Sequence, residues 1–518
     1  MRKSILLPAM LACVTFAFTQ EQVDTKMMQQ IKDEEKNHSQ ITWIAHNLTD
    51  VCGARLTNSP GYNRALNWLT ETFNNWKLTN VNKEPWGEFG KGWSTESVYI
   101  ALKQPYYQPV IAYPLAWSGS TNNAISSEVI LLDKLDSASI DKLGDNIKGK
   151  IVLVKLPDTT KLHSAFVPFA KRYDSSQLDT LPDTYMLTRE EITHIMPAKK
   201  RGNAIRLYLQ QKGALAILTS NTSERDGTIF VSGTQGYAAG YGVTIPQLML
   251  SLEDHLKIQR LLVDKKPVAI EMNVQNKFYT DDLTGYNMIG EIEGTDPTLK
   301  SEVVMLGGHL DSWHSGTGAT DNGAGCIVMM EVMHILKALN VQPKRTIRIA
   351  LWGGEEQGLL GSFGYVKKHF GNPADMNLKP EQKKISAYYN LDNGSGKVRG
   401  IFLQNNEKLR DIFKAWLAPF ADMGATGITK SNTGSTDHLS FDAVGIPGFQ
   451  FIQDPLEYET RTHHSNMDTY DHLSIEDLQQ AATVIAAFVY NTAMRNEMLP
   501  RKPLSAPGRF VFDLDGPL

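Results

Sequence analysis

Cysteine is scarce in this sequence, which has three such residues among 518, namely Cys13, Cys52 and Cys326. Small proteins that depend on disulfide bonds carry cysteine at a far higher density, so that class is excluded. Cys326 falls in an apolar segment and is expected to pack in a core. Cys52 stands before Gly53 in a predicted loop, and the sequence leaves open whether Cys52 and Cys326 form a disulfide bond.

Runs of lysine and arginine are absent as well. The formal net charge is −4, charged residues make up 21% of the chain and hydrophobic residues 42%. This composition is typical of a globular protein and not of a disordered chain. It lacks the basic stripe that a nucleic-acid partner requires, so no such partner is expected. A chain of this length predicts two or three domains.

Long hydrophobic runs are missing after the first twenty residues, so no membrane span is predicted. Residues 1–20 themselves begin with Arg2 and Lys3 and continue as an apolar stretch over 5–18. That order is typical of a secretory signal peptide, and we expect an exported protein, periplasmic or secreted. A lipoprotein signal at Cys13 is disfavoured because the apolar stretch continues beyond it.

Polar side chains gather where the apolar runs of residues 303–356 begin or end. The pattern over this stretch predicts a strand, a loop, a helix and a second strand. Ligands in open α/β sheets bind just beyond the carboxyl ends of the strands, which is where these side chains fall. The polar side chains are His309, Asp311, Asp321, Glu355 and Glu356.

An imidazole with several carboxylates is a ligand set that suits zinc. Two zinc ions about 3.5–4 Å apart can share one bridging carboxylate. Ordinary polar loop residues would not recur at successive strand ends. Glu355 and Glu356 leave their strand in different directions, so one can bind metal while the other faces water.

Three motifs in this stretch resemble those of the M28 family of zinc peptidases. They are GGHLDSW (307–313), ATDNGAG (319–325) and WGGEEQGLLGS (352–362). Asp321 follows His309 by twelve residues and Glu356 follows Asp321 by 35, spacings that fit the family, and the similarity extends from about Cys52 to the C-terminus. The family includes bacterial aminopeptidases, plasma glutamate carboxypeptidase and the folate hydrolase group.

The resemblance implies an α/β fold with a mixed sheet sandwiched by helices and an inserted, β-rich protease-associated domain. We expect the catalytic domain over 21–125 and 275–518 and the insert over 126–274, where short apolar strands replace the longer elements. Residues 157–200 form a long polar segment inside the insert. This segment is expected either to cover the active site as a lid or to decorate the surface.

The resemblance also implies a role for each site residue. His309, Asp321 and Asp392 would bind one Zn2+, and Asp321, Glu356 and His464 the second. Glu355 would be the general base, and Asp311 would orient the imidazole of His309. His463 stands where many relatives have a tyrosine that stabilises the oxyanion, and a histidine N–H could serve the same purpose.

The predicted function is that of an exopeptidase acting on peptide substrates, as a monomer or homodimer. An aminopeptidase is favoured, because that activity is common in exported members. The alternative is a carboxypeptidase or dipeptidase, in which Arg399 or Arg461 would bind the substrate carboxylate. A glutaminyl cyclase uses one zinc ion, and receptor-like relatives have lost ligands, so both are more distant alternatives.

Two further segments have competing interpretations. Asp50 and Arg55 lie in a loop that borders the predicted site, and they either contact substrate or hold the loop through local hydrogen bonds. Ser435, Asp437 and His438 are too close in sequence to converge as a serine triad, and no nucleophile elbow accompanies them. We expect the latter segment to shape the floor of the pocket.

Overall fold

The computed structural model of this chain describes residues 21–157, 168–183, 203–238 and 240–507. The predicted signal peptide lies outside the described residues, as does much of the segment 157–200. In the described part, no helix is both long enough and apolar enough to cross a membrane. Cys52 and Cys326 are buried and unpaired there, so the disulfide alternative is not realised in the structure.

The first sheet has eight strands with parallel and antiparallel neighbours. In spatial order these are β1 (Thr79–Glu88), β10 (Thr284–Ile292), β12 (Thr346–Trp352), β11 (Val303–His309), β15 (Ile385–Asn390), β18 (Gly448–Gln453), β16 (Val398–Phe402) and β17 (Gly427–Thr429). Strands β12, β11, β15 and β18 are mutually parallel, and every residue of β11, β15 and β18 is buried. Burial on both faces explains why these strands are nearly continuous apolar runs in the sequence.

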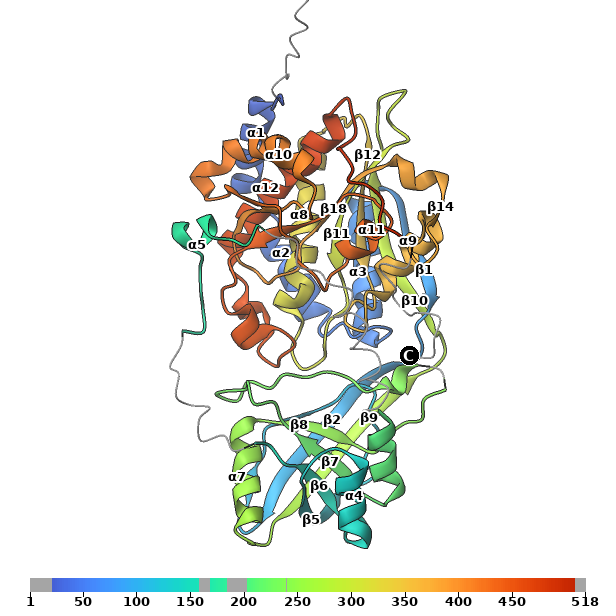
Figure 1. Cartoon of the computed structure of the whole chain (residues 1–518), viewed down its shortest axis with the longest axis vertical. Coiled ribbons are helices and arrows are strands. Elements are labelled where there is room, and N and C mark those ends of the chain that lie inside the picture. Colours follow the sequence, from blue (N-terminus) through green and yellow to red (C-terminus); the bar gives the residue numbers. More distant parts are fainter. Residues whose placement is uncertain (1–20, 158–167, 184–202, 239, 508–518) are drawn as a thin grey trace, which may run out of the picture.

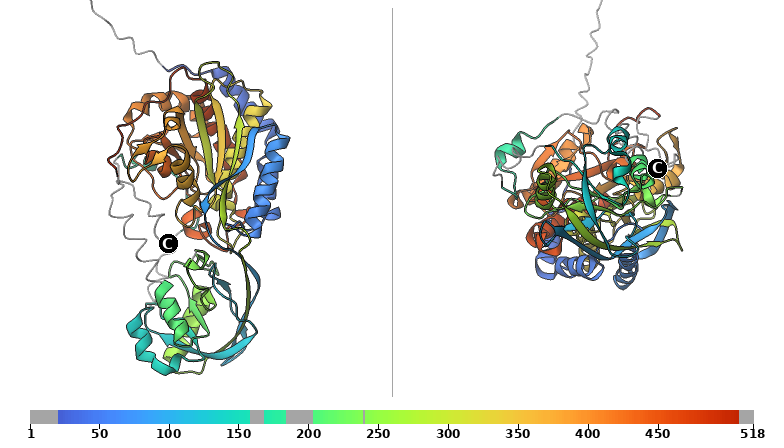
Figure 2. Two further views of the ribbon diagram at one scale, coloured as in Figure 1. Left: turned by 90° about the vertical axis from the view of Figure 1, so that its right-hand side faces the viewer. Right: turned by 90° about the horizontal axis from the view of Figure 1, so that it is seen from below.

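Helices cover both faces of the first sheet, as the edge-on view in Figure 2 shows. One face carries α1 (Thr25–His38), α2 (Ile41–His46), α3 (Pro60–Asn75), α8 (Ala324–Ala338), α10 (Arg410–Leu417) and α12 (Ile475–Met494), whose apolar side chains share one large core. The other face carries α9 (Leu360–His369) and α11 (His438–Asp442), which pack in a smaller core. The predicted mixed sheet between helices is therefore confirmed.

The second sheet also has eight strands and lies below the first in Figure 1. Its order is β3 (Gln108–Pro109), β2 (Gly92–Gln104), β9 (Ala269–Tyr279), β5 (Ile125–Leu132), β6 (Ile151–Val154), β7 (Ala216–Thr219), β8 (Gln247–Leu250) and β4 (Ala112–Pro114). Helices α4 (Ser137–Leu143) and α7 (Leu252–Val263) and residues 203–211, also helical, pack beside it. A short hairpin, β13 (Gly371–Asn372) with β14 (Asn377–Leu378), stands apart from both sheets.

The second sheet draws on a longer stretch of chain than the expected insert of 126–274. Strand β2 pairs with β9 from Gly92 to Gln104, so the second-sheet region, as we call residues 92–279, starts well before residue 126. Burial along β2 does not alternate, since residues 92–93 and 100–102 are buried and residues 96–99 are exposed. Only the long-range pairing with β9 reveals which sheet it joins, and the domain boundaries themselves stay a prediction.

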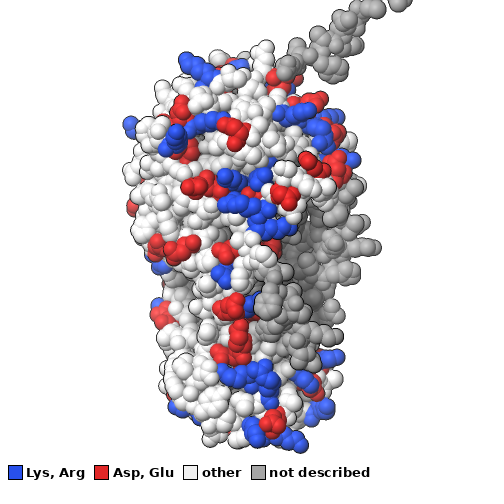
Figure 3. Space-filling model, turned by 90° about the vertical axis from the view of Figure 1, so that its left-hand side faces the viewer, with Lys and Arg blue, Asp and Glu red and all other residues white. Residues whose placement is uncertain are grey.

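We call the part of the chain built around the first sheet the first body, and the second-sheet region the second body. Residues 168–183 belong to the second-sheet region but lie against the first body. They contain α5 (Ser175–Asp179), which Figure 1 shows beside the helices of the upper body. On the face of the molecule drawn in Figure 3, acidic and basic side chains are interspersed over both bodies.

Candidate metal centre

The predicted site residues converge at the carboxyl ends of the central strands of the first sheet. His309 ends β11, Glu355 and Glu356 follow β12, and Asp392 follows β15. These strands are parallel and adjacent, so their carboxyl ends meet. Asp321 comes from the turn η4 (Ala319–Gly323), whose backbone is kinked and not helical at Asp321 itself (φ −122°, ψ 95°). His463 and His464 follow the turn η8 (Tyr458–Thr462), reached from the end of β18.

Asp321 lies at the centre of the group. Its carboxylate oxygens are 3.3 Å from Nε2 of His309 and 3.3 Å from Nε2 of His464. Asp392 Oδ1 is 3.4 Å from the same nitrogen of His309, and Glu356 Oε2 is 2.9 Å from Nε2 of His464. One carboxylate therefore separates two ligand sets, each with an imidazole and a further carboxylate.

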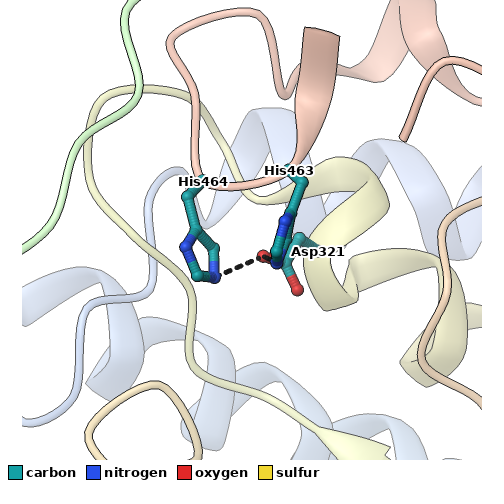
Figure 4. A group of neighbouring side chains, drawn as sticks. All are labelled: Asp321, His463 and His464. Atoms are coloured by element: carbon teal, nitrogen blue, oxygen red, sulfur yellow. Dashed lines mark ion pairs between the residues drawn. The ribbon is translucent and has the colours of Figure 1, made fainter. Parts of the chain in front are cut away.

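Figure 4 shows His463 and His464 reaching toward Asp321 from the same loop. His463 Nε2 is 3.8 Å from Asp321 Oδ2, and the two imidazole rings are 3.9 Å apart. On distance alone His463 competes with Glu356 as a ligand. Glu356 is the better candidate because its side chain is only 3% exposed and its Oε2 lies 2.9 Å from Nε2 of His464, whereas Nε2 of His463 is 3.8 Å from Asp321.

Backbone groups orient the ligands beneath the site. Nδ1 of His309 hydrogen-bonds the main-chain carbonyl of Asp311 at 2.8 Å, while the carboxylate of Asp311 is 3.8 Å away. The Asp311 carboxylate instead accepts from the N–H groups of Glu355 and Glu356 and from the hydroxyl of Thr57. Asp311 therefore orients His309 through its carbonyl rather than its side chain, and its side chain positions the glutamate pair.

Asp468 supports Asp321 from behind and was not among the predicted site residues. Its carboxylate accepts hydrogen bonds from the N–H groups of Thr320 and Asp321 at 2.6 and 3.1 Å. Burial raises the pKa of Asp468 to about 7. The role of Asp468 depends on a contact across 147 residues, which the local pattern does not show.

Tyr458 is a second functional neighbour that the sequence did not indicate. It is 6% exposed, and its ring lies 4.7 Å from that of His463. Burial, and then the negative charges of Asp321 and Asp392, raise the pKa of its phenol well above the ordinary value. Gly394 makes room for the ring, because a Cβ at that position would lie 3.0 Å from it. A tyrosine six residues before a metal histidine has no sequence signature of its own.

The site gathers more negative charge than its own cations neutralise. Burial raises the pKa of Glu355 and of Glu356 well above the usual range, and neighbouring carboxylates raise both further. Burial opposes protonation of His309, but Asp392 and Glu355 raise the pKa of its imidazole well above the usual value. Glu355 and Glu356 therefore hold protons that a cation would displace.

These residues fit a pair of divalent cations. Buried oxygens of Asp321, Glu356 and Asp392 have no hydrogen-bond partner among the described residues. Unpartnered buried carboxylate oxygens cost free energy unless a cation neutralises them. Nitrogen and oxygen donors at this spacing are the set that zinc prefers.

Other candidates from the sequence prove structural. Arg55 is fully buried and donates to the main-chain carbonyls of Leu310, Thr317 and Gly318, so it holds the loops under the site. Asp50 hydrogen-bonds His46 on the surface. Arg399 donates to the buried carboxylate of Asp454 and is not available for a substrate carboxylate.

The segment 435–438 forms no serine triad. Nε2 of His438 contacts Gln404 and the carbonyl of Thr433, and burial lowers the pKa of its imidazole to about 3. Asp437 is buried near Glu355 and Asp392, close enough to raise the pKa of Glu355. The segment therefore adds negative charge beside Glu355.

Comparison with known proteins agrees with this geometry. Residues 287–489 match peptidase family M28. Carboxypeptidase Q of Bos taurus is 27% identical over 88% of this chain and 85% of its own length. Aminopeptidase YwaD of Bacillus subtilis is 27% identical over 73% of this chain and 77% of its own.

Solved structures share the fold. A peptidase M28 precursor from Shewanella amazonensis superposes with a TM-score of 0.68 at 24% identity, over 92% of this chain and 99% of that chain. A zinc aminopeptidase from Bacillus subtilis gives a TM-score of 0.55 at 20% identity, over 90% and 95%. This chain therefore carries a domain of peptidase family M28, which confirms the prediction made from its three motifs.

Proposed function

We propose that this chain is an exopeptidase that hydrolyses peptide bonds with the help of two zinc ions. The observation that carries the proposal is the carboxylate of Asp321, 3.3 Å from an imidazole nitrogen on either side. His309, Asp321 and Asp392 would hold one ion, and Asp321, Glu356 and His464 the other. Bound zinc lowers the pKa of water to about 7 and polarises the substrate carbonyl.

Glu355 is the proposed general base. Its side chain is 10% exposed, more open than that of Glu356, and one oxygen lies 4.0 Å from Nε2 of His309. The hydrogen bond from its N–H to Asp311 fixes its backbone. Glu355 takes the proton of the attacking water and passes it to the leaving amine.

His463 and Tyr458 are the proposed donors to the oxyanion. Nε2 of His463 lies 3.8 Å from the Asp321 carboxylate, and the ring of Tyr458 packs 4.7 Å from the ring of His463. An N–H or O–H group held in place before the reaction stabilises the charge that develops on the substrate oxygen. This pair would replace the single tyrosine that many M28 relatives have in the position of His463.

The amino end of the substrate is the end that this site suits best. A cluster of buried carboxylates attracts the free α-ammonium group of a peptide. Asp437 adds to the cluster beside Glu355. Arg399, which could have bound the opposite end, is committed to Asp454. We therefore propose an aminopeptidase, the activity that the name of the relative YwaD also gives.

A carboxypeptidase or dipeptidase is the second candidate, and two observations favour it. The chain is similar to carboxypeptidase Q over 88% of its length. Arg461 lies two residues before His463, and its nearest carboxylate oxygen, on Glu457, is 3.8 Å from Nε. That loose ion pair leaves donors available for a substrate carboxylate.

We also infer that the protein is exported, because residues 1–20 have the composition of a signal peptide. Its substrates would then be extracellular or periplasmic peptides.

Hydrolysis of one tripeptide in three forms tests the function and the choice of end. The zinc-loaded protein is given the free, the N-acetylated and the C-amidated peptide. For an aminopeptidase we expect acetylation to abolish cleavage and amidation to leave it unchanged. The reverse pattern establishes the carboxypeptidase. No cleavage of any form by protein that holds two zinc ions contradicts both candidates.

A further inference from the structure

The loop that carries both site histidines, residues 454–466, is contacted on two sides by the second-sheet region. We call this stretch the histidine loop. It belongs to the first body, since it connects β18 with the segment before α12. Its two contacts come from residues 227–231 and 169–173, which are far away in the sequence.

The first contact lies directly behind His464. The N–H of Val231 donates to the carbonyl of His464 at 2.7 Å, and Phe230 and Ser465 form an antiparallel bridge. The side chain of Asn466 accepts from the N–H of Ile229 at 2.7 Å and donates to the carbonyl of Gly227 at 3.2 Å. Its own N–H donates to Ile229 at 3.1 Å.

Residues 227–231 are themselves fixed to the second sheet. Ile229 and Val231 are buried in a small core with Leu115, and Met249 of β8 packs against that core. Residues 227–231 therefore connect the carbonyl of His464 to the second sheet. The other predicted ligands are supplied by the first sheet.

The second contact joins residues 169–173 to the start of the histidine loop. Lys171 and Leu456 exchange two main-chain hydrogen bonds of 2.8 Å. Arg172 donates to Asp454 at 3.2 Å and to Asp477 of α12 at 2.6 Å, and both carboxylates are buried. Phe169 accepts from the hydroxyl of Thr460 at 2.6 Å, and its ring lies 4.0 Å from the guanidinium of Arg461.

His464 needs such support because of its backbone. Its φ is +59°, in the left-handed region that a residue with a Cβ adopts only when its surroundings impose it. The hydrogen bonds from Val231 and around Asn466 fix the backbone directly after this torsion. Without them the imidazole would lose its place beside Glu356 and Asp321.

We propose that the second-sheet region positions His464 as a metal ligand, with Asn466 as the positioning residue. This inference rests on the proposed two-zinc site. It predicts that loss of the Asn466 side chain weakens the binding of the zinc ion held by Glu356 and His464. The binding of the other ion should not change, because His309 and Asp392 take no part in this contact. Groups that orient ligands typically contribute about 10–100-fold to metal affinity.

The test is the zinc affinity of the full-length Asn466→Ala protein, measured by competition with a chelator. Wild type is expected to bind two zinc ions tightly. The variant is expected to keep one tight ion and to bind the second at least about tenfold more weakly. Excess zinc should restore turnover. The matched control is Asn276→Ala, whose side chain makes similar hydrogen bonds, to Ser118 and Gly119, inside the second-sheet region.

Arg172→Met supplies a second variant from the other contact. Its side chain is 49% exposed, so the change is tolerable for folding, and it is expected to weaken the same ion. Two tightly bound ions in both variants overturn the inference and leave the proposed function standing. Equal weakening of both ions, or the same loss in Asn276→Ala, indicates a general structural effect and also overturns it. A wild type that binds no zinc refutes the proposed function and the inference together.

Discussion

At the scale of single residues, the site depends on Asp321. Its carboxylate separates two ligand sets, and Asp468 holds its backbone in place. Glu355 and Glu356 are neighbours in the chain, yet Glu356 contacts His464 while Glu355 is more open to solvent. Two adjacent carboxylates can thus have different roles, one as metal ligand and one as base.

Replacement of Glu355 by glutamine should separate metal binding from catalysis. The amide keeps the size of the side chain but accepts no proton, so kcat should fall by at least about 100-fold while two zinc ions remain bound. Metal analysis and steady-state kinetics measure the two effects. Glu381→Gln, at an exposed position in a surface turn, is the control. Near-normal turnover in the Glu355 variant with full metal content would remove Glu355 from the mechanism.

Removal of the Tyr458 hydroxyl tests its proposed role as a donor. In Tyr458→Phe the ring still fills the space over Gly394 and beside His463, so folding and zinc content should not change. We expect kcat to fall by about tenfold or more with little change in KM, because the lost bond forms mainly in the transition state. Tyr286→Phe, which removes a surface hydrogen bond to Asp282, is the control. An unchanged kcat would restrict Tyr458 to a packing role.

At the scale of elements, α1 brings a buried acid into the largest core. Glu35 is 2% exposed, neither of its carboxylate oxygens has a hydrogen-bond partner among the described residues, and Glu331 of α8 lies close by. Burial and the nearby Glu331 raise the pKa of Glu35 to about 9. The backbone turns at Ser39, so that α1 and α2 pack separately against α8.

This raised pKa predicts how stability depends on pH. The folded state holds the Glu35 proton up to about pH 9, whereas the unfolded chain releases it near 4.5. The free energy of unfolding therefore loses up to about 1.4 kcal/mol per pH unit between these values. Glu35→Gln should match wild type near pH 4.5 and become increasingly more stable than wild type toward pH 9. Denaturant unfolding across this range measures the difference.

The neighbouring Glu34 supplies the control for that experiment. It is on the same helix and pairs with His38 near the surface. Glu34→Gln should not reproduce the growing gain in stability toward pH 9. A Glu35→Gln protein whose stability tracks wild type at every pH would mean that Glu35 is ionised throughout.

At the scale of the whole molecule, the sequence predicted what depends on local pattern. Apolar runs located β11 and β12, and the polar residues at their ends located His309, Glu355 and Glu356, while Asp392 and His464 came from the resemblance to the family. The local sequence pattern could not predict which distant segments pair with one another. The start of the second-sheet region at Gly92 depends on β9, and the contacts of the histidine loop depend on residues more than 200 positions away.

Zinc removal should lower the stability of the whole protein. A ligand that binds only the folded state stabilises it by about 4 kcal/mol when its free concentration is a thousand times Kd. We expect a chelator to lower the Tm clearly and added zinc to restore it. In Asp321→Ala, which loses the bridging carboxylate, the Tm should not respond to zinc. A normal zinc response in that variant would show that the ions bind elsewhere.

Diffraction from zinc-loaded crystals at the zinc absorption edge tests the central claim most directly. The account predicts two anomalous peaks about 3.5–4 Å apart, one on each side of the Asp321 carboxylate. His309 and Asp392 should contact one peak, and Glu356 and His464 the other. A single peak, or two peaks that Asp321 does not bridge, would contradict the two-zinc site on which the proposed peptidase mechanism depends.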